Sequence, residues 1–209
     1  MVKIKSGQQK TSKRRSRKTV DKWKSKVWYE VNASPEFENI YIGQTPASDE
    51  NMLYNRVIEN SLYDFTQDFN HAHIKLRFKI KEVNGSLCTT QFIGHEMTRD
   101  FIRSLIRRGA NRIDGIIDTK TKDGFTFRIT GAVFTRNMAK SSQQKTIRKI
   151  MYDIIAEQAK NLPFQEFVRE IVFGSIEKDI RRISNEIYPI RDCKLIKSRL
   201  VASPVMDEE

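Results

Sequence analysis

His95 and Glu96 are the first two residues of the HExxH motif of zinc proteases, in which two histidines four residues apart bind the metal and the glutamate acts as base. The fifth position here is Arg99, so the second histidine ligand is absent and a cation stands in its place. A zinc-protease site is therefore not expected. His71 and His73 alternate on an extended segment, but without a fourth well-spaced ligand they do not predict a metal site either.

Carboxylates are the second candidate for chemistry in this region, because phosphoryl-transfer nucleases hold Mg²⁺ between clustered acids. Such a cluster is available in principle from Glu96, Asp100, Asp114 and Asp118. Simpler roles explain two of them, since Asp100 falls in the first turn of a predicted helix and Asp114 precedes a turn glycine. We expect no catalytic residue, metal or cofactor, and keep a magnesium-dependent RNA-processing enzyme as the alternative function.

The arginines of the same stretch, HEMTRDFIRSLIRRGANRIDG, form a stronger pattern. If Thr98 caps a helix that ends at Gly109, each residue advances about 100° around the axis, and one side of the helix is almost purely guanidinium. The arginines of that side are Arg99, Arg103 and Arg107, flanked by Arg108 and Arg112, and the apolar side is Phe101, Ile102, Leu105 and Ile106. A guanidinium donates two parallel hydrogen bonds to phosphate, whereas a solvated helix would also contain glutamates. The pattern predicts a phosphate-binding helix.

Charge is segregated along the 209-residue chain, whose formal net charge is +12. Residues 1–28 hold eleven Lys and Arg against one Asp, and residues 71–149 hold seventeen against six acids. Residues 29–70, between them, hold eight acids against one Arg. Clustered cations gain free energy on a polyanion by releasing its counterions, so this distribution favours a nucleic-acid partner.

Composition also suggests the domain organisation. Residues 1–20 have almost no apolar content and are expected to be a disordered arm that lies along a phosphate backbone. Residues 21–200 are predicted to form a single domain, and residues 201–209 a short acidic tail. The candidate RNA contacts of the arm are Lys13, Arg14, Arg15, Arg17 and Lys18.

Three further features bear on the surroundings of the protein. The apolar runs are too short to span a bilayer, no signal peptide is visible, and the two cysteines offer no disulfide framework, so we expect a cytoplasmic protein without membrane contact. Trp23, Trp28 and Tyr29 are interleaved with lysines, and rings among cations can stack on unpaired bases. We expect these rings instead to seat the first strand in the core, and leave base stacking open.

Two hairpins are predicted in the middle of the chain. HIKLRFKIKEVNGSLCTTQFIG alternates apolar and basic residues before an Asn84-Gly85 turn, so one face of its first strand is apolar and the other is basic. The basic face adds Lys75, Arg77 and Lys79 to the candidate RNA contacts. A second hairpin turns at Asp123-Gly124.

Helical spacing follows the hairpins. SSQQKTIRKIMYDIIAEQAK predicts a helix over about 142–160 that begins with a Ser141–Gln144 capping box. Its cations Lys145, Arg148 and Lys149 are further candidate RNA contacts. LPFQEFVREIVFG and SIEKDIRRISNEI predict two more helices, and CKLIKSRLV a last strand. This order predicts an α+β fold with a mostly antiparallel, barrel-like sheet and packed amphipathic helices in the C-terminal half.

Several blocks of the chain closely resemble a known family. FIGHEMTRDFIRSLIRRGANRIDG, TKTKDGFTFRIT, SSQQKTIRKIM, EFVREIVFGSIEKDI and IYPIR, with DKWKSKVWY, IGQTPASDE and HIKLRFKI upstream, are similar to the archaeal and eukaryotic small-ribosomal-subunit protein family S-three-a-e (S3Ae). The resemblance covers residues 20 to 200 in unbroken order, and the length resembles the archaeal form. Residues 32–41 follow the family only loosely.

The resemblance implies a non-catalytic constituent of the small subunit with a β-barrel-like sheet and packed helices. It implies contact with ribosomal RNA near its 3′ region, on the platform near the mRNA exit, with neighbouring platform proteins as partners; messenger RNA is a partner that it leaves open. The basic helix of the family corresponds here to Arg99, Arg103, Arg107 and Arg108, and its IRK block to Arg148 and Lys149. An anionic-membrane binder is a weaker hypothesis, because no basic helix here carries an exposed aromatic face.

Overall fold

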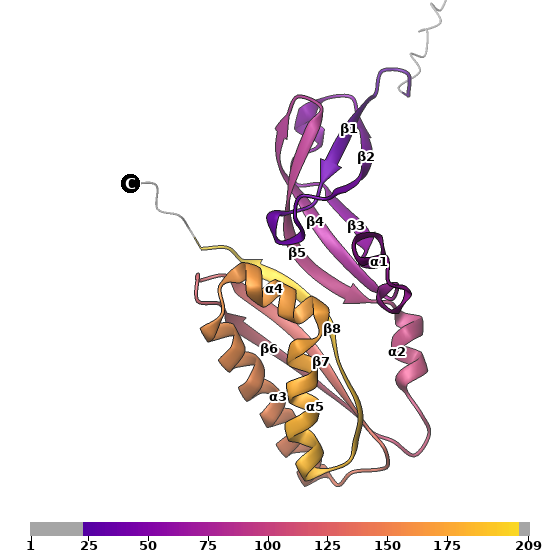
Figure 1. The fold of residues 1–209 in the computed structure, drawn as a ribbon, viewed down its shortest axis with the longest axis vertical. Helices are drawn as coiled ribbons and strands as arrows, with labels where there is room; N and C mark the ends of the chain where they lie inside the picture. The colour runs from indigo at the N-terminus through magenta and orange to yellow at the C-terminus, as the bar shows by residue number, and fades with distance from the viewer. Residues whose placement is uncertain (1–22, 205–209) are drawn as a thin grey trace, which may run out of the picture.

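A computed structural model describes residues 23–204, which form one α+β fold (Figure 1). Eight strands make one sheet in the order β2-β1-β5-β8-β7-β6, to which β4 and β3 add on the remaining edge of β5. The strands are β1 Val27–Asn32, β2 Tyr41–Ala47, β3 Val57–Ser61, β4 Ile74–Asn84, β5 Leu87–Met97, β6 Arg112–Lys120, β7 Thr126–Thr135 and β8 Ile190–Ala202. The predicted fold class is confirmed, although the sheet does not close into a barrel. The predicted arm lies outside the described residues.

β5 joins two lobes of this sheet. One of its edges pairs with β4 along its whole length, while the other pairs with β1 at Leu87 and Cys88 and with β8 from Gly94 to Glu96. The N-terminal lobe contains β1–β5, and the C-terminal lobe contains β6–β8 with its helices (Figure 1). Among the strand pairs formed by residues 23–204, only β1 with β5 is parallel.

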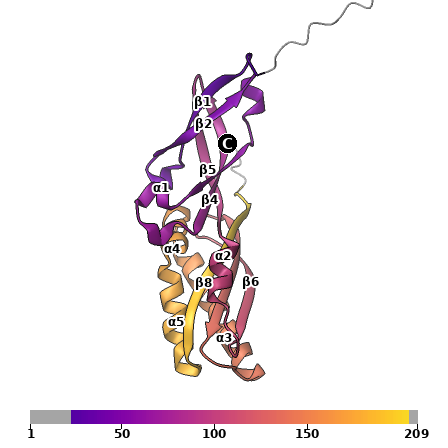
Figure 2. The same cartoon turned by 90° about the vertical axis from the view of Figure 1, so that its right-hand side faces the viewer.

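Three helices cover one face of the C-terminal lobe: α3 Ser141–Asn161, α4 Phe164–Phe173 and α5 Ser175–Ile187 (Figures 1 and 2). Their apolar sides bury Ile147, Met151 and Ile180 against the sheet, as their helical spacing predicts. α3 packs so closely on β6 that a Cβ atom at Gly115 would lie 2.1 Å from Cε of Met151. Burial of this helix face contributes to the hydrophobic stabilisation of the lobe.

The N-terminal lobe has its own short elements between strands: η1 Pro35–Phe37, η2 Glu50–Met52, α1 Tyr63–Thr66 and η3 Phe69–His71. Phe37 of η1 packs its ring against Phe78 of β4 and Phe92 of β5, with centroids 5.5 and 5.7 Å apart. The same cluster continues into the C-terminal lobe through residues such as Phe127, so one core spans both lobes.

Both predicted hairpins are confirmed, with a small shift in the first turn. The first hairpin turns at Gly85-Ser86, one residue later than predicted, because Asn84 and Leu87 are paired and Gly85 has a φ of 62° at the first loop position. The second hairpin turns between Lys120 and Thr126, around Asp123-Gly124 as predicted.

The beginning of α3 differs from the prediction. Ser141 is already helical, so the cap is one residue earlier: the Lys140 N–H donates to Oε1 of Gln143 at 3.0 Å. The Gln144 side chain donates to the Ala139 carbonyl at 2.9 Å. The predicted Ser141–Gln144 capping box is therefore wrong, because the glutamines satisfy backbone groups one residue further towards the N-terminus.

The tryptophans are not core residues. Trp23 and Trp28 are 60% and 53% exposed, and their rings meet edge to face with centroids 6.3 Å apart. The inward positions of β1 are Tyr29 and Val31, and because side chains of a strand alternate, Trp28 must face outward. The expectation that both tryptophans seat the first strand in the core is wrong, and Tyr29 alone of the three rings does so.

Candidate nucleic-acid interface

β4 has the two faces that its sequence predicts. Ile74, Leu76, Phe78 and Ile80 are buried, while Lys75, Arg77 and Lys79 lie on the opposite side. The outer side is not purely cationic, however. Arg77 donates to Oε1 of Glu59 on β3 at 2.8 Å and to Oε2 of Glu96 on β5 at 3.0 Å, so the neighbouring strands neutralise it.

The same outer face continues across the sheet. Strand register places Arg77 beside Gly94, Gly94 beside Arg199 of β8, and Arg199 beside Arg128 of β7. The adjacent row runs from Lys75 through Glu96 to Lys197. Residues directly opposite each other on neighbouring strands lie about 5 Å apart, so these side chains form a continuous charged surface.

Two hollows lie on this surface, with volumes of about 300 and 450 Å³. Arg77 and Glu59 line both, so the hollows adjoin each other. The cations around them are Lys75, Arg77, Arg99, Lys197 and Arg199, and we call this set the sheet surface. Sequence reasoning identified the first three and missed Lys197 and Arg199, although their alternation in the predicted strand CKLIKSRLV places them on one face.

The crossing of β5 and β8 under the sheet surface depends on Gly94. A Cβ atom there would lie 2.1 Å from the carbonyl oxygen of Ser198, so no other residue permits this approach without moving the backbone. His95, the next residue, is 1% exposed; its Nε2 donates to the Leu195 carbonyl at 2.8 Å. Burial lowers the pKa of His95 from 6.5 to about 4, so this ring is neutral and holds two strands together.

Helix α2 is shorter than predicted: it spans Arg99–Leu105 instead of reaching Gly109. Ile106 adopts extended dihedral angles, and Arg191 of β8 donates to the Leu105 carbonyl, which satisfies an acceptor that a longer helix would use. Arg107 and Arg108 therefore follow the helix and do not continue its arginine side. The predicted stack of three arginines on one helix is wrong for Arg107.

The apolar side of α2 packs on the outer face of the C-terminal lobe, as the contacts of Ile102 and Leu105 with Ala132, Phe134 and Ile196 show (Figure 2). Arg99 and Arg103 are consequently exposed on the other side of the helix. Their guanidinium groups form no ion pair with any residue from 23 to 204. The predicted exposure of these two arginines opposite the apolar side of the helix is confirmed, and their contact with phosphate stays a prediction.

Five other predicted cations lie where the α2–β6 segment passes the beginning of α3, together with Arg136 and Lys140, which sequence reasoning missed. Asn111 joins the two segments, because its Oδ1 accepts the N–H of Ala139 at 2.6 Å and its own N–H donates to Thr135 at 2.8 Å. We call the cations of these segments the lobe end: Arg107, Arg108, Arg112, Arg136, Lys140, Lys145 and Lys149.

Two of the predicted contacts have structural partners. Nε of Arg112 lies 2.7 Å from Oδ1 of Asp114, and Nε of Arg148 donates to the Asp114 carbonyl at 2.8 Å, which ties α3 to β6. Like Arg77, these guanidinium groups are less available to phosphate. Among the described residues, the predicted contacts without a carboxylate partner are Lys75, Lys79, Arg99, Arg103, Arg107, Arg108, Lys145, Arg148 and Lys149. The arm cations lie outside the described residues.

Three of the four carboxylates of the alternative hypothesis, those of Glu96, Asp114 and Asp118, are paired with cations. Asp118 accepts two hydrogen bonds from Arg128, both 2.7 Å, and they lower the pKa of Asp118. Glu96 lies 3.1 Å from Lys197 as well as contacting Arg77. Within the described part of the chain, no three His, Cys, Asp or Glu residues are arranged to hold a metal ion. None of the helices of residues 23–204 has the length and apolar character of a membrane span.

Comparison with known proteins gives one consistent result. Residues 14–204 match the Ribosomal S3Ae family. The chain is 43% identical over 188 residues to small ribosomal subunit protein eS1 of Methanopyrus kandleri, covering 88% of this chain and 89% of that protein. It is 45% identical over 184 residues to the eS1 protein of Staphylothermus marinus, with 88% and 87% covered, and 41% identical over 184 residues to that of Sulfurisphaera tokodaii, with 88% and 95% covered.

Proposed function

This chain belongs to the ribosomal S3Ae family, and from that premise we propose that it is a structural constituent of the small ribosomal subunit that binds ribosomal RNA. The observation that carries the proposal is the match to eS1 proteins over nearly the whole length of both chains. It is a protein of the cytoplasm, where that subunit works, and the family to which it belongs is one of ribosomal proteins, not of enzymes.

Electrostatics supports ribosomal RNA as the ligand. The sheet surface and the lobe end together hold twelve cationic residues, nine of which have no carboxylate partner among the described residues. Phosphate contacts from such cations provide affinity without requiring a base sequence. Arg99 and Arg103 supply planar donors for phosphate beside the hollows of the sheet surface. The basic arm at 1–20 is proposed to follow the phosphate backbone further along.

The proposal also includes the position of the protein within the small subunit. The blocks that resemble the family support a position on the platform near the mRNA exit, in contact with the 3′ region of the ribosomal RNA and with neighbouring platform proteins. Messenger RNA passing the exit is a further partner that the same cations suit. Protection of the 3′ region of the ribosomal RNA from hydroxyl radicals, lost when the protein is absent, tests this placement.

Sedimentation tests the function itself. Epitope-tagged chain in cell extract is expected to travel with small subunits through a sucrose gradient at low salt and to leave them as salt is raised, because counterion release weakens with ionic strength. A chain that stays with free proteins at the top of a low-salt gradient contradicts the proposal.

A further inference from the structure

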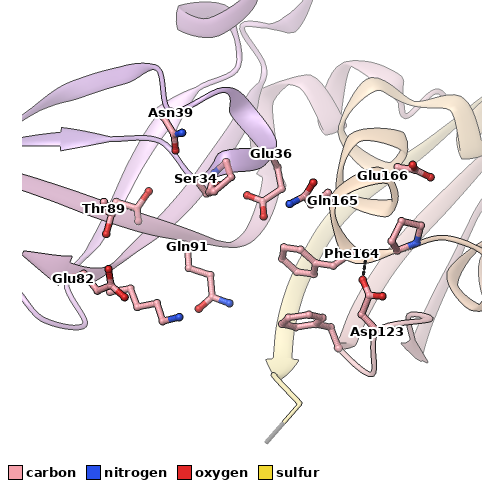
Figure 3. Close-up of a pocket in the computed structure, with 15 residues that line it drawn as sticks. Ser34, Glu36, Asn39, Glu82, Thr89, Gln91, Asp123, Phe164, Gln165 and Glu166 are labelled. Atoms are coloured by element: carbon pink, nitrogen blue, oxygen red, sulfur yellow. Dashed lines mark hydrogen bonds between the residues drawn. The ribbon is translucent and has the colours of Figure 1, made fainter. Parts of the chain in front are cut away.

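A cleft of about 540 Å³ lies between the two lobes (Figure 3). One wall is formed by η1 and by the ends of β4 and β5 at their hairpin; the other is formed by the β6–β7 turn and the beginning of α4. Cavities between about 300 and 1,000 Å³ hold ligands of several linked groups. The cleft therefore has room for an extended segment of peptide or for a few large side chains.

The cleft is acidic, in contrast to the protein as a whole. Four carboxylates line it, from Glu36, Glu82, Asp123 and Glu166, against the single ammonium group of Lys81. A phosphate backbone would be repelled by this lining, and desolvating it there would add to the cost. The ligand that the charge favours is a cation.

Glu36 supplies the strongest reason for a ligand. Its residue is only 8% exposed, and its Oε2 atom is buried without a hydrogen-bond partner among residues 23–204. The hydroxyl of Ser34, 1% exposed and also in the lining, has no such partner either. An unpaired buried carboxylate oxygen is costly, so a site that retains one is suited to a donor from outside.

The fold fixes the Glu36 side chain at this place. Pro35 begins η1 with the helical φ that proline favours, and Arg169 of α4 donates to the Glu36 carbonyl at 3.1 Å, which binds η1 to the opposite lobe. Figure 3 shows the carboxylate of Glu36 and the amide of Gln165 facing each other across the cleft. The acceptor is thus held in position before any ligand arrives.

An aromatic wall completes the site. The rings of Phe125 and Phe164 lie with centroids 4.3 Å apart at one side of the cleft (Figure 3). Oδ2 of Asp123 accepts the N–H of Phe164 at 2.7 Å, so the wall is anchored to the first turn of α4. Phe164 is 6% exposed and also packs on Phe127, whereas Phe125 is only half-buried, so Phe125 is the ring that a ligand can reach. A planar cation can pack on such a ring while its N–H groups reach a carboxylate, which matches a guanidinium better than an ammonium group.

We propose that the cleft between the lobes binds a cationic side chain, best matched by arginine, from an extended segment of a neighbouring protein of the small subunit. That this segment belongs to a protein of the small subunit rests on the proposed function. Glu36 pairs with the cation, and the Phe125 ring covers its face. RNA contacts then occupy the basic outer surfaces while this acidic cleft takes a protein partner.

Site-specific photo-cross-linking tests the proposal in assembled subunits. Benzoylphenylalanine at Gln165, which is exposed at the cleft, is introduced into full-length chain that replaces the chromosomal copy, and small subunits are irradiated and digested for mass spectrometry. The expected product links residue 165 to another protein, within two residues of an Arg or Lys. A link to ribosomal RNA, to residues 1–22 of the same chain, or to a segment without a cation overturns the proposal, as does the absence of any link.

Charge variants of Glu36 test whether its carboxylate binds the cation. Glu36→Lys is expected to lower the yield of the cross-link at least about tenfold, and Glu36→Gln, which preserves shape, to lower it in the same direction, because a charge-assisted hydrogen bond is lost. Glu157→Lys, on an exposed position of α3, makes the same charge change and should leave the yield unaltered. Equal yields for Glu36→Gln and the parent contradict the role of Glu36. Parent chain that fails to enter subunits contradicts the proposed function itself, whereas entry without the cross-link contradicts only the cleft.

Discussion

His95 and Ser198, 103 residues apart, form two hydrogen bonds with each other. The backbone N–H of His95 donates to Oγ of Ser198 at 3.1 Å, and that hydroxyl donates to Nδ1 of the same histidine at 2.7 Å. With Nε2 donating to Leu195, every polar atom of the ring is satisfied by β8. The residue that begins an apparent zinc motif is therefore a joint between the two lobes.

Lowering the pH should reduce the free energy of unfolding by protonating His95. The folded-state pKa of His95 is about 4 against 6.5 in the unfolded chain, so protonation favours unfolding. Its contribution is complete above about pH 6.5 and is lost as the pH falls to about 4, a difference of about 3 kcal/mol. Urea unfolding at pH 7, 6, 5 and 4 measures this. In His95→Gln most of that pH dependence should disappear; an unchanged slope would show that other groups cause it.

Gly94→Ala should destabilise the protein by about 3 kcal/mol or more, because its Cβ would lie 2.1 Å from a backbone oxygen that cannot rotate away. Gly43→Ala is the matched control, since nothing lies within 4 Å of its added Cβ. Thermal unfolding of both variants compares them. Similar melting temperatures for the two would contradict the close approach of β5 and β8.

Arg103→Glu together with Arg107→Glu should weaken association with small subunits while leaving the free energy of unfolding within about 0.5 kcal/mol, because both side chains are exposed and unpaired among the described residues. If each contacts one phosphate, the slope of log affinity against log salt should fall by about 1.5. The control is Lys178→Glu with Arg181→Glu on α5, which changes the charge equally on the opposite face. Equal losses in both pairs would indicate a general effect of net charge.

The two thiols should be unreactive in the folded protein. Cys88 and Cys193 are 0% and 2% exposed, and burial raises the pKa of both, so little reactive thiolate forms at neutral pH. A thiol reagent such as dithionitrobenzoate should label no cysteine in native chain and two in 6 M guanidinium. Rapid labelling of native protein would show that one of these core positions opens readily.

Much of the fold is predictable because local periodicity determines it. The alternation around Phe78 and the helical spacing around Met151 correctly indicate which side chains are buried. The end of α2 was not predictable, since it depends on Arg191, which lies 86 residues from the Leu105 carbonyl that it binds. Trp28 was assigned to the core by residue type, but the alternation of β1 places it outside.

The candidate sites were likewise predictable only in part from the sequence. Residue type suggested Lys75, Arg77 and Arg99 as phosphate contacts, and the structure brings them together with Lys197 and Arg199. The sequence did not reveal that Glu59 and Glu96 neutralise Arg77, because those acids come from other strands. Nor did it reveal the acidic cleft, whose walls come from segments between 34 and 166 that only the tertiary fold brings together.

The position of β8 between β5 and β7 has a consequence for biosynthesis. β8 is translated after both of its neighbours, so the nascent chain must wait with two unpaired strand edges until β8 leaves the exit tunnel and inserts between them. Such edges invite pairing with other chains, and long-range pairing forms slowly. We therefore expect the nascent chain to be most prone to aggregation in the interval just before β8 emerges.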